Sequence, residues 1–274
     1  MLMLLVIISY TICTVSDKYV LMKEKVNRDE FGFYIAFTFA FLLTFYLPFT
    51  DCSFEWSIHS LLVVLGTAVC KLVELRTLAE VLKELTAFEL KAWLGMCVFI
   101  SYFIDILWGN DSFSVGKILL ILVTAVGLLL IVMDRNRKID YRKIAFTLVL
   151  YLASRLLYGV AIRSGSGVIS STLVLYLSLW IVCLFTGFKA HPMRMRREGR
   201  RALAIISVTR IINIVGSIAE NVVITVSLVQ YSLIQPGILV VLFFIKVFYK
   251  EEVNRRNLIG SILCILGIVG FTLL

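Results

Sequence analysis

Residues 114–143 read SVGKILLILVTAVGLLLIVMDRNRKIDYRK, an apolar run of membrane length followed at once by a basic cluster. A helix needs about 20 mainly apolar residues to cross the hydrocarbon core of a bilayer, at 1.5 Å of rise per residue. Basic connections stay on the cytoplasmic side of a membrane. This segment therefore predicts a membrane span and also the side on which the span ends.

The same arrangement recurs along the whole chain. Alternate connections, at residues 17–30, 134–143, 189–201 and 250–257, hold 18 Lys and Arg residues, whereas the connections between them hold only Lys117 and Arg163. This bias predicts cytoplasmic basic connections and two extracytoplasmic termini. Ten spans are expected, at residues 2–21, 31–49, 57–76, 81–106, 114–133, 143–162, 168–188, 202–220, 225–249 and 257–274.

Composition supports a multi-pass membrane protein, and we expect it in the plasma membrane. The chain has 274 residues, 60% of them hydrophobic, against about 45–50% for an ordinary soluble domain. The net charge of +9 lies in clusters between apolar spans, so membrane lipid rather than nucleic acid is the expected partner. Six cysteines without a CxxC pair and two histidines form no recognisable metal-binding pattern, and we expect no cofactor.

The two halves of the chain resemble each other weakly. Residues 115–122 (VGKILLIL) match residues 259–266 (IGSILCIL) at an offset of 144 positions. This offset places the fifth span on the tenth, and because five is odd the second half enters the membrane from the opposite side. Chance similarity between apolar helices is the alternative. We favour an all-α integral membrane protein of two inverted five-helix repeats, residues 1–133 and 134–274, with a substrate site between them.

The most distinctive motifs lie in about the last 45 residues: SLIQPG at 232–237, FYKEE at 248–252, LIG at 258–260 and LGIVG at 266–270. With the ten-span layout, they resemble EamA-type transporters of the drug/metabolite transporter superfamily. The resemblance implies a transporter with both termini cytoplasmic, the reverse of what the charge bias predicts. The first half departs from the family pattern, because Ala92 stands at the counterpart of the ninth-span proline and the turn WGND at 108–111 lacks a glutamate.

Charged side chains occur inside several predicted spans. At the bilayer centre each costs about 2.5–3.5 kcal/mol, so a chain keeps them where they face protein or water. Arg155 and Arg210 lie near the middle of their spans, and an arginine fork suits a carboxylate or phosphate. With Lys71 or Lys91 they would form an anion-binding cavity. The predicted substrate-binding residues are Arg155, Arg210, Lys71, Glu74, Glu89, Lys91 and Gln235.

The acidic residues of this set have several possible roles. Lys71 and Glu74 are one helical turn apart and can pair. Glu74 and Glu89 could neutralise an empty cavity, hold a substrate ammonium or carry a coupling proton. The alternative is an internal ion-pair network that only fixes packing. Four other charged residues are expected near helix ends, as interfacial anchors: Arg76, Lys83, Glu84 and Glu220.

Other features of the spans are less specific. Pro236 and Gly237 predict a kink in the ninth span, either static or a hinge for alternating access. Small residues on the tenth span predict close internal packing, with a homodimer as the alternative. They are Gly260, Ser261, Cys264, Gly267 and Gly270. Aromatic residues that could line a cavity are Tyr10, Trp93, Tyr102, Tyr151, Tyr158 and Tyr176.

The function expected from the sequence is secondary transport of a small anionic or zwitterionic solute by alternating access. A flippase for a lipid-linked sugar or aminolipid would share the fold. A membrane-embedded enzyme is disfavoured, because the two histidines are isolated and no acidic cluster lies at a membrane interface. A non-transporting assembly or sensor protein should have fully paired central charges and no cavity.

Overall fold

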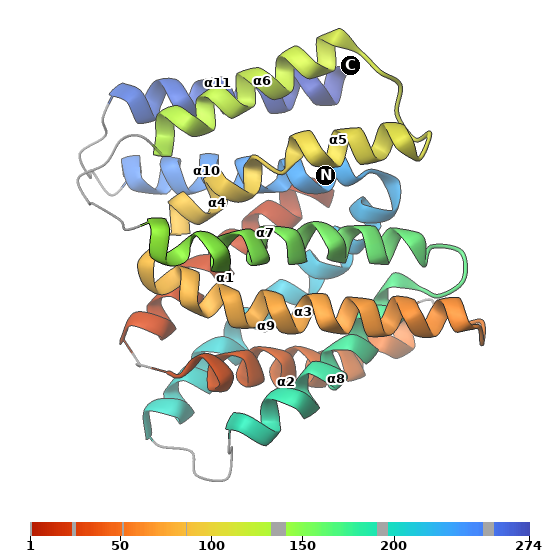
Figure 1. The fold of residues 1–274 in the computed structure, drawn as a ribbon. Coiled ribbons are helices and arrows are strands. Elements are labelled where there is room, and N and C mark those ends of the chain that lie inside the picture. Colours follow the sequence, from red (N-terminus) through yellow and green to blue (C-terminus); the bar gives the residue numbers. More distant parts are fainter. Residues whose placement is uncertain are drawn as a thin grey trace.

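The structure, a computed structural model, describes residues 2–23, 26–50, 52–85, 87–132, 141–190, 197–248 and 255–274. Within these ranges the regular elements are helices, with one isolated bridge between Phe54 and Ile169 (Figure 1). The helices are α1 (Leu2–Lys23), α2 (Arg28–Tyr46), the 3-10 helix η1 (Leu47–Phe49), α3 (Ile58–Glu84), α4 (Ala87–Gly95), α5 (Val98–Leu107), α6 (Val115–Val132), α7 (Tyr141–Ser164), α8 (Ser171–Ala190), α9 (Arg197–Val226), α10 (Leu228–Phe248) and α11 (Arg255–Leu273).

The helices are long and apolar enough for a multi-pass membrane protein. Among the described residues, eight helical segments satisfy both criteria, one of them formed by α4 and α5 together over Glu89–Leu107. Two shorter apolar helices, Val115–Leu130 and Leu258–Phe271, lie in α6 and α11. Large apolar side chains are exposed on the outer faces, among them Phe45, Leu61 and Phe146. The expected all-α membrane fold is confirmed.

The boundary between the third and fourth predicted spans is wrong. Helix α3 continues through residues 77–84, so Lys83 and Glu84 belong to its last turn and α4 begins only at Ala87. Two earlier charged residues of α3, Arg76 and Glu80, pair with the start of α2, and the helix continues through them. Glu80 forms an ion pair with Arg28 at the start of α2, and a second α3 side chain, Arg76, lies 3.5 Å from Asp29.

Helix α9 is also longer than predicted. It contains 30 residues, Arg197–Val226, against the expected 202–220. Hydropathy predicts that the span ends at Glu220, because a charged side chain is costly inside a membrane. In the structure Glu220 is 1% exposed and lies well inside the helix. Its predicted role as an interfacial anchor is therefore wrong.

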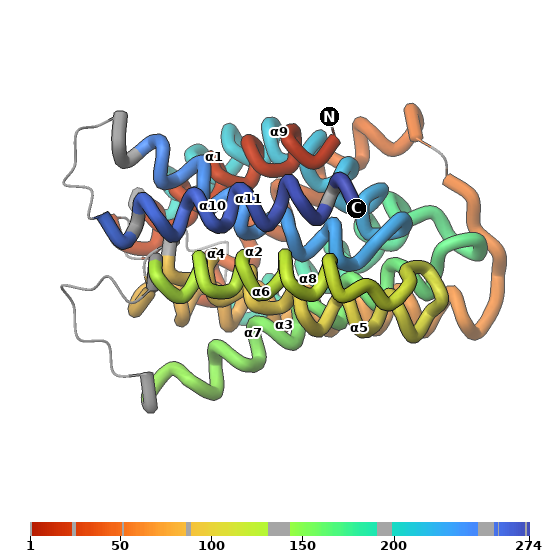
Figure 2. The backbone as a smooth tube through the Cα atoms, turned by 90° about the horizontal axis from the view of Figure 1, so that it is seen from above, coloured from red at the N-terminus to blue at the C-terminus, as the bar shows by residue number. Residues whose placement is uncertain are grey.

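The helices run back and forth between two ends of the bundle (Figures 1 and 2). One end, here called the basic end, holds the C-terminal ends of α1, α3, α6, α8 and α10 and the N-terminal ends of α2, α4, α7, α9 and α11. The C-terminal ends of α2, α5, α7 and α9 and both chain termini lie toward the other end, here called the opposite end. Several of the basic residues that predicted this side lie outside the described residues: Lys25, Arg135, Arg137, Lys138, Arg194, Arg196 and Lys250.

Helices from the two halves of the chain pack against each other in pairs. The most extensive contacts join α6 with α11, α1 with α9, α3 with α7 and α2 with α8. The α6–α11 pair is close because its contact residues are small. A Cβ atom added to Gly127 would lie 2.6 Å from the Gly260 oxygen, and one added to Gly267 would lie 2.0 Å from Thr124 Oγ1. The prediction that the small residues of α11 pack internally is confirmed, and the homodimer stays a prediction.

Helix α10 is continuous through Pro236, whereas its neighbour is interrupted between α4 and α5 at residues 96–97. These helices approach closely, since a Cβ atom added to Gly95 would lie 3.1 Å from Pro236 Cγ. Helix α1 packs against the next residue, since a Cβ atom on Gly237 would lie 2.5 Å from Ile7 Cδ1. Gly237 therefore permits close helix packing, and a hinge at Pro236 and Gly237 stays a prediction.

Candidate functional site

A cavity of about 110 Å³ lies between the two halves of the chain. One buried water occupies about 10–15 Å³ of such a cavity volume, so the cavity has room for several waters or one small solute. Helices α1, α2, α3 and α4 of the first half contribute to its wall, as do α7, α8 and α9 of the second half. Its charged lining residues are Asp17, Lys71, Glu74, Lys91, Arg155, Arg210 and Glu220.

Most of the predicted binding residues lie on this cavity. Five of the seven line it: Lys71, Glu74, Lys91, Arg155 and Arg210. Gln235 does not, but its Oε1 atom accepts a hydrogen bond of 3.0 Å from Lys91. Glu89 is buried on α4 and is not among the lining residues.

The aromatic candidates divide in the same way. Three of the six line the cavity: Tyr10, Tyr151 and Tyr158. Trp93, Tyr102 and Tyr176 are not among its lining residues, and Tyr102 packs edge-on against Phe271 instead.

Arg155 on α7 links helices of both halves. Its Nη1 donates to Glu74 Oε1 on α3 at 3.0 Å, and its Nη2 donates to Glu220 Oε1 on α9 at 2.8 Å. The predicted pairing of Lys71 with Glu74 is confirmed at 2.9 Å. Tyr10 on α1 donates a hydrogen bond to Glu220. Because the fork holds two carboxylates on different helices, Arg155 fixes the positions of α3 and α9 around the cavity.

Arg210 forms a separate ion pair across the α1–α9 contact. Its Nη2 lies 2.6 Å and 2.7 Å from the two carboxylate oxygens of Asp17. Its Nε is buried and has no hydrogen-bond partner among the described residues. Arg210 is 5% exposed, so this N–H is withheld both from bulk water and from a protein acceptor.

The charges on the cavity wall do not balance. In their usual ionisation states the lining residues carry four positive and three negative charges. Each of the three carboxylates has a basic partner in the pairs described above. Among the described residues, Lys91 is the cavity cation without a carboxylate partner, since its hydrogen bond goes to the neutral amide of Gln235. The residues that line the cavity therefore carry an excess of one positive charge.

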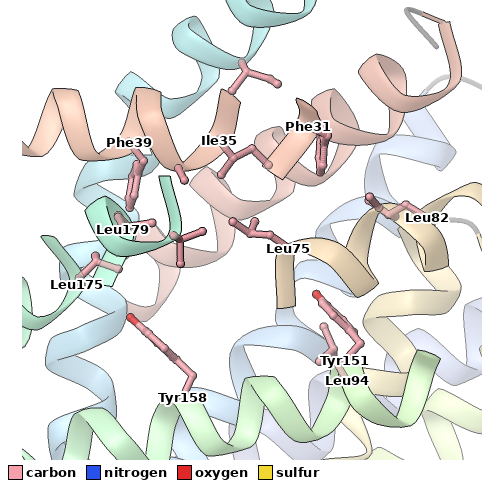
Figure 3. Packing of buried hydrophobic residues seen from close by; sticks show 14 of the residues in the cluster. Phe31, Ile35, Phe39, Leu75, Leu82, Leu94, Tyr151, Tyr158, Leu175 and Leu179 are labelled. Atoms are coloured by element: carbon pink, nitrogen blue, oxygen red, sulfur yellow. The ribbon is translucent and has the colours of Figure 1, made fainter. Parts of the chain in front are cut away.

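Apolar side chains form the rest of the wall. Figure 3 shows Leu75 from α3 and Leu179 from α8 facing the space into which Tyr151 and Tyr158 project from α7. Tyr158 donates to Asn221 at 2.8 Å, and its ring lies 3.9 Å from Lys71 Nζ. The site thus combines a charged network with hydrocarbon walls, which is typical of small-molecule sites.

Sequence reasoning missed Asp17 and misplaced Glu220. The charge pattern places Asp17 in the basic connection at residues 17–30, yet it is 5% exposed on α1. A polar stripe at helical spacing could have revealed both residues. On α1 the stripe contains Tyr10, Cys13, Thr14 and Asp17, and on α9 it contains Arg210, Asn213, Ser217 and Glu220.

A second buried charge cluster lies at the opposite end of the bundle. Arg163, predicted as a loop charge, is 8% exposed and forms an ion pair with Asp105 of α5. Asp105 Oδ2 also accepts from Ser227 Oγ at 2.9 Å and from the Val229 backbone N–H at 3.0 Å. Arg163 Nη2 donates to the Val226 oxygen at 3.1 Å. This opposite-end cluster joins α5 and α7 to the α9–α10 connection.

Comparison with known proteins gives no family assignment. No model of a known protein family matches the chain, and a search of curated proteins finds no significant relative. The structure itself identifies a multi-pass, all-helical membrane protein with a charged cavity between its two halves.

Proposed function

We propose that this protein is a secondary transporter that moves a small anionic or zwitterionic solute by alternating access. The observation that carries the proposal is the charged cavity enclosed by helices of both halves. A network that served only packing would need no open space among its members. Intramembrane charges are expensive and mark solute pathways in membrane proteins, and here seven of them line one cavity.

The inverted repeat belongs to the same proposal and is supported by the packing pattern. In an inverted repeat, each helix of the first half has a counterpart in the second: α1 corresponds to α7, α2 to α8, α3 to α9 and α6 to α11. The contact of α1 with α9 then corresponds to that of α7 with α3, and the contact of α2 with α9 to that of α8 with α3; all four contacts are extensive. The contacts of α6 with α11 and of α2 with α8 join counterparts directly. Lys91 and Gln235, which bond to each other, are 144 positions apart, the offset of the sequence match. A two-fold axis in the membrane plane would produce this arrangement.

Alternating access assigns different roles to the two ends of the bundle. The cavity lining reaches toward the basic end through Leu82 of α3 and Leu90 of α4. The opposite-end cluster ties α5, α7 and the start of α10 together. We propose that the structure corresponds to the conformation closed at the opposite end, and that transport requires the cluster to separate while the basic end closes. In this proposal the membrane is the plasma membrane and the basic end is cytoplasmic.

The proposal also includes membership of the EamA-type transporters, with the termini on the side opposite to the one that the resemblance implies. A flippase of the same fold is a weaker alternative, because its site should open laterally through apolar residues. Here seven charged side chains line the space between the helices, which favours a water-soluble solute over a lipid-linked one.

The test is uptake into proteoliposomes that contain the purified full-length chain. The panel is lactate, glutamate, betaine and, as a lipophilic cation, tetraphenylphosphonium. We expect uptake of an anion or the zwitterion, its loss in the Arg210→Gln variant, and its retention in Lys117→Gln, whose lysine pairs with Asp111 outside the cavity. Uptake of tetraphenylphosphonium alone, uptake of no member, or a wild-type rate in correctly inserted Arg210→Gln would overturn the proposal.

A further inference from the structure

We infer that the solute bound in the cavity is a small monocarboxylate with a short hydrocarbon part, whose carboxylate is held by Lys91 and Arg210. This inference rests on the proposed transport function and names the substrate class. Three features of the cavity carry it: its charge imbalance, its unused hydrogen-bond donors and its apolar wall.

The charge imbalance favours a ligand with one negative charge. Four basic and three acidic side chains line the cavity, and Lys91 has no carboxylate partner among the described residues. A bound monoanion would complete the set of pairs. A phosphate monoester carries about −1.5 to −2 charges, and a dicarboxylate carries two, so either would leave an uncompensated negative charge in a buried site. A cation would add to the existing excess.

The unused hydrogen-bonding groups of the cavity are mainly donors. An ammonium has three donors, and Lys91 uses one of them on Gln235. Arg210 Nε has no hydrogen-bond partner among the described residues, and the Tyr151 hydroxyl lines the same cavity. One acceptor of the wall, Asn213 Oδ1, is also without a partner among them. Lys91, Arg210 and Tyr151 are 7%, 5% and 3% exposed, so these donors lie deep in the protein. An ionised carboxylate has only acceptors and therefore complements them.

The apolar wall accounts for the rest of the ligand. Leu78, Leu82 and Leu90 line the same cavity as Lys91, toward the basic end. A short alkyl chain would contact these side chains while its carboxylate reaches the donors. The cavity volume of about 110 Å³ limits the ligand to a small acid.

The test is isothermal titration calorimetry of the purified, full-length protein in detergent with butyrate, butyramide and succinate. Butyramide has nearly the shape of butyrate without its charge, and succinate adds a second carboxylate. We expect butyrate to bind about tenfold or more tightly than butyramide, the range for hydrogen bonds to a charged group, and also more tightly than succinate. Equal binding of butyrate and butyramide, tighter binding of succinate, or no butyrate binding would overturn the inference.

Two variants test whether Lys91 is the residue that recognises the negative charge of butyrate. In Lys91→Gln the preference for butyrate over butyramide should vanish, whereas Lys117→Gln, outside the cavity, should keep it. An unchanged preference in Lys91→Gln would remove Lys91 from the site. If Lys91→Gln fails to fold, Tyr151→Phe replaces it, with an expected loss of butyrate affinity of about 2–10-fold; no loss would also contradict the inference.

Failure of this inference can be told apart from failure of the proposed function. If betaine or glutamate enters proteoliposomes while butyrate does not bind, the proposed transport is supported and the monocarboxylate site is refuted. If butyrate binds but no solute of the panel enters proteoliposomes, the binding site is supported and the proposed transport is refuted.

Discussion

Removal of the Arg155 side chain should destabilise the protein more than removal of any surface charge. Arg155 forms ion pairs of 3.0 Å with Glu74 and 2.8 Å with Glu220, and all three residues are less than a tenth exposed. The variant Arg155→Met would leave Glu220 buried without a basic partner, while Glu74 would keep Lys71 at 2.9 Å. Breaking a buried pair in this way costs about 3–5 kcal/mol of unfolding free energy.

The assay is thermal unfolding of the purified protein in detergent, followed by intrinsic fluorescence. At roughly 2–4 °C per kcal/mol, Arg155→Met should lower the melting temperature by about 6–20 °C. The double variant Arg155→Met/Glu220→Gln should recover much of this loss, because an amide replaces the unpaired carboxylate. A melting temperature of Arg155→Met within about 2 °C of the wild type, or a double variant less stable than the single one, would refute the reasoning.

Three further predictions test other parts of the structure. Gly127→Ala should lower the unfolding free energy by about 1–3 kcal/mol, because the new Cβ would lie 2.6 Å from a backbone oxygen of α11. Gly66→Ala should raise it by about 0.5–1 kcal/mol, because a Cβ there has nothing within 4 Å. Equal shifts of the melting temperature in the two variants would contradict this reasoning. Asp105→Asn should lower the unfolding free energy by about 3–5 kcal/mol in the same melting assay, because it leaves Arg163 buried without a counter-charge. An unchanged melting temperature would show that the opposite-end cluster does not stabilise the fold. The exposed Cys52, at the opposite end, should react with an impermeant maleimide on intact cells, and Cys52→Ser should not; labelling only after permeabilisation would reverse the orientation inferred from the basic connections.

The position of the spans could be predicted from the sequence because hydropathy is a local property. The central charges were recognisable for the same reason, since Arg155 and Arg210 each lie far from any predicted helix end. The pairing of Lys71 with Glu74 was also accessible, because it depends only on spacing within one helix.

The partners of the arginines could not be predicted, because they depend on which helices pack together. Asp17 and Arg210 are separated by 193 positions and meet only through the α1–α9 contact. Hydropathy predicts a helix end at Glu220 because its acidic side chain interrupts the apolar run, yet α9 continues through it to Val226. A helix crosses such a residue when a buried arginine compensates its charge, and that compensation is a tertiary property.

The central claim is that one cavity opens in turn to the two sides of the membrane. It is tested most directly by the native Cys13, which lines the cavity, in a variant whose other five cysteines are replaced by serine. Impermeant methanethiosulfonate is applied from each side in turn to proteoliposomes in which the protein has one orientation. Alternating access predicts that the same Cys13 population is modified from either side. Modification from one side alone, or from neither, would contradict the account.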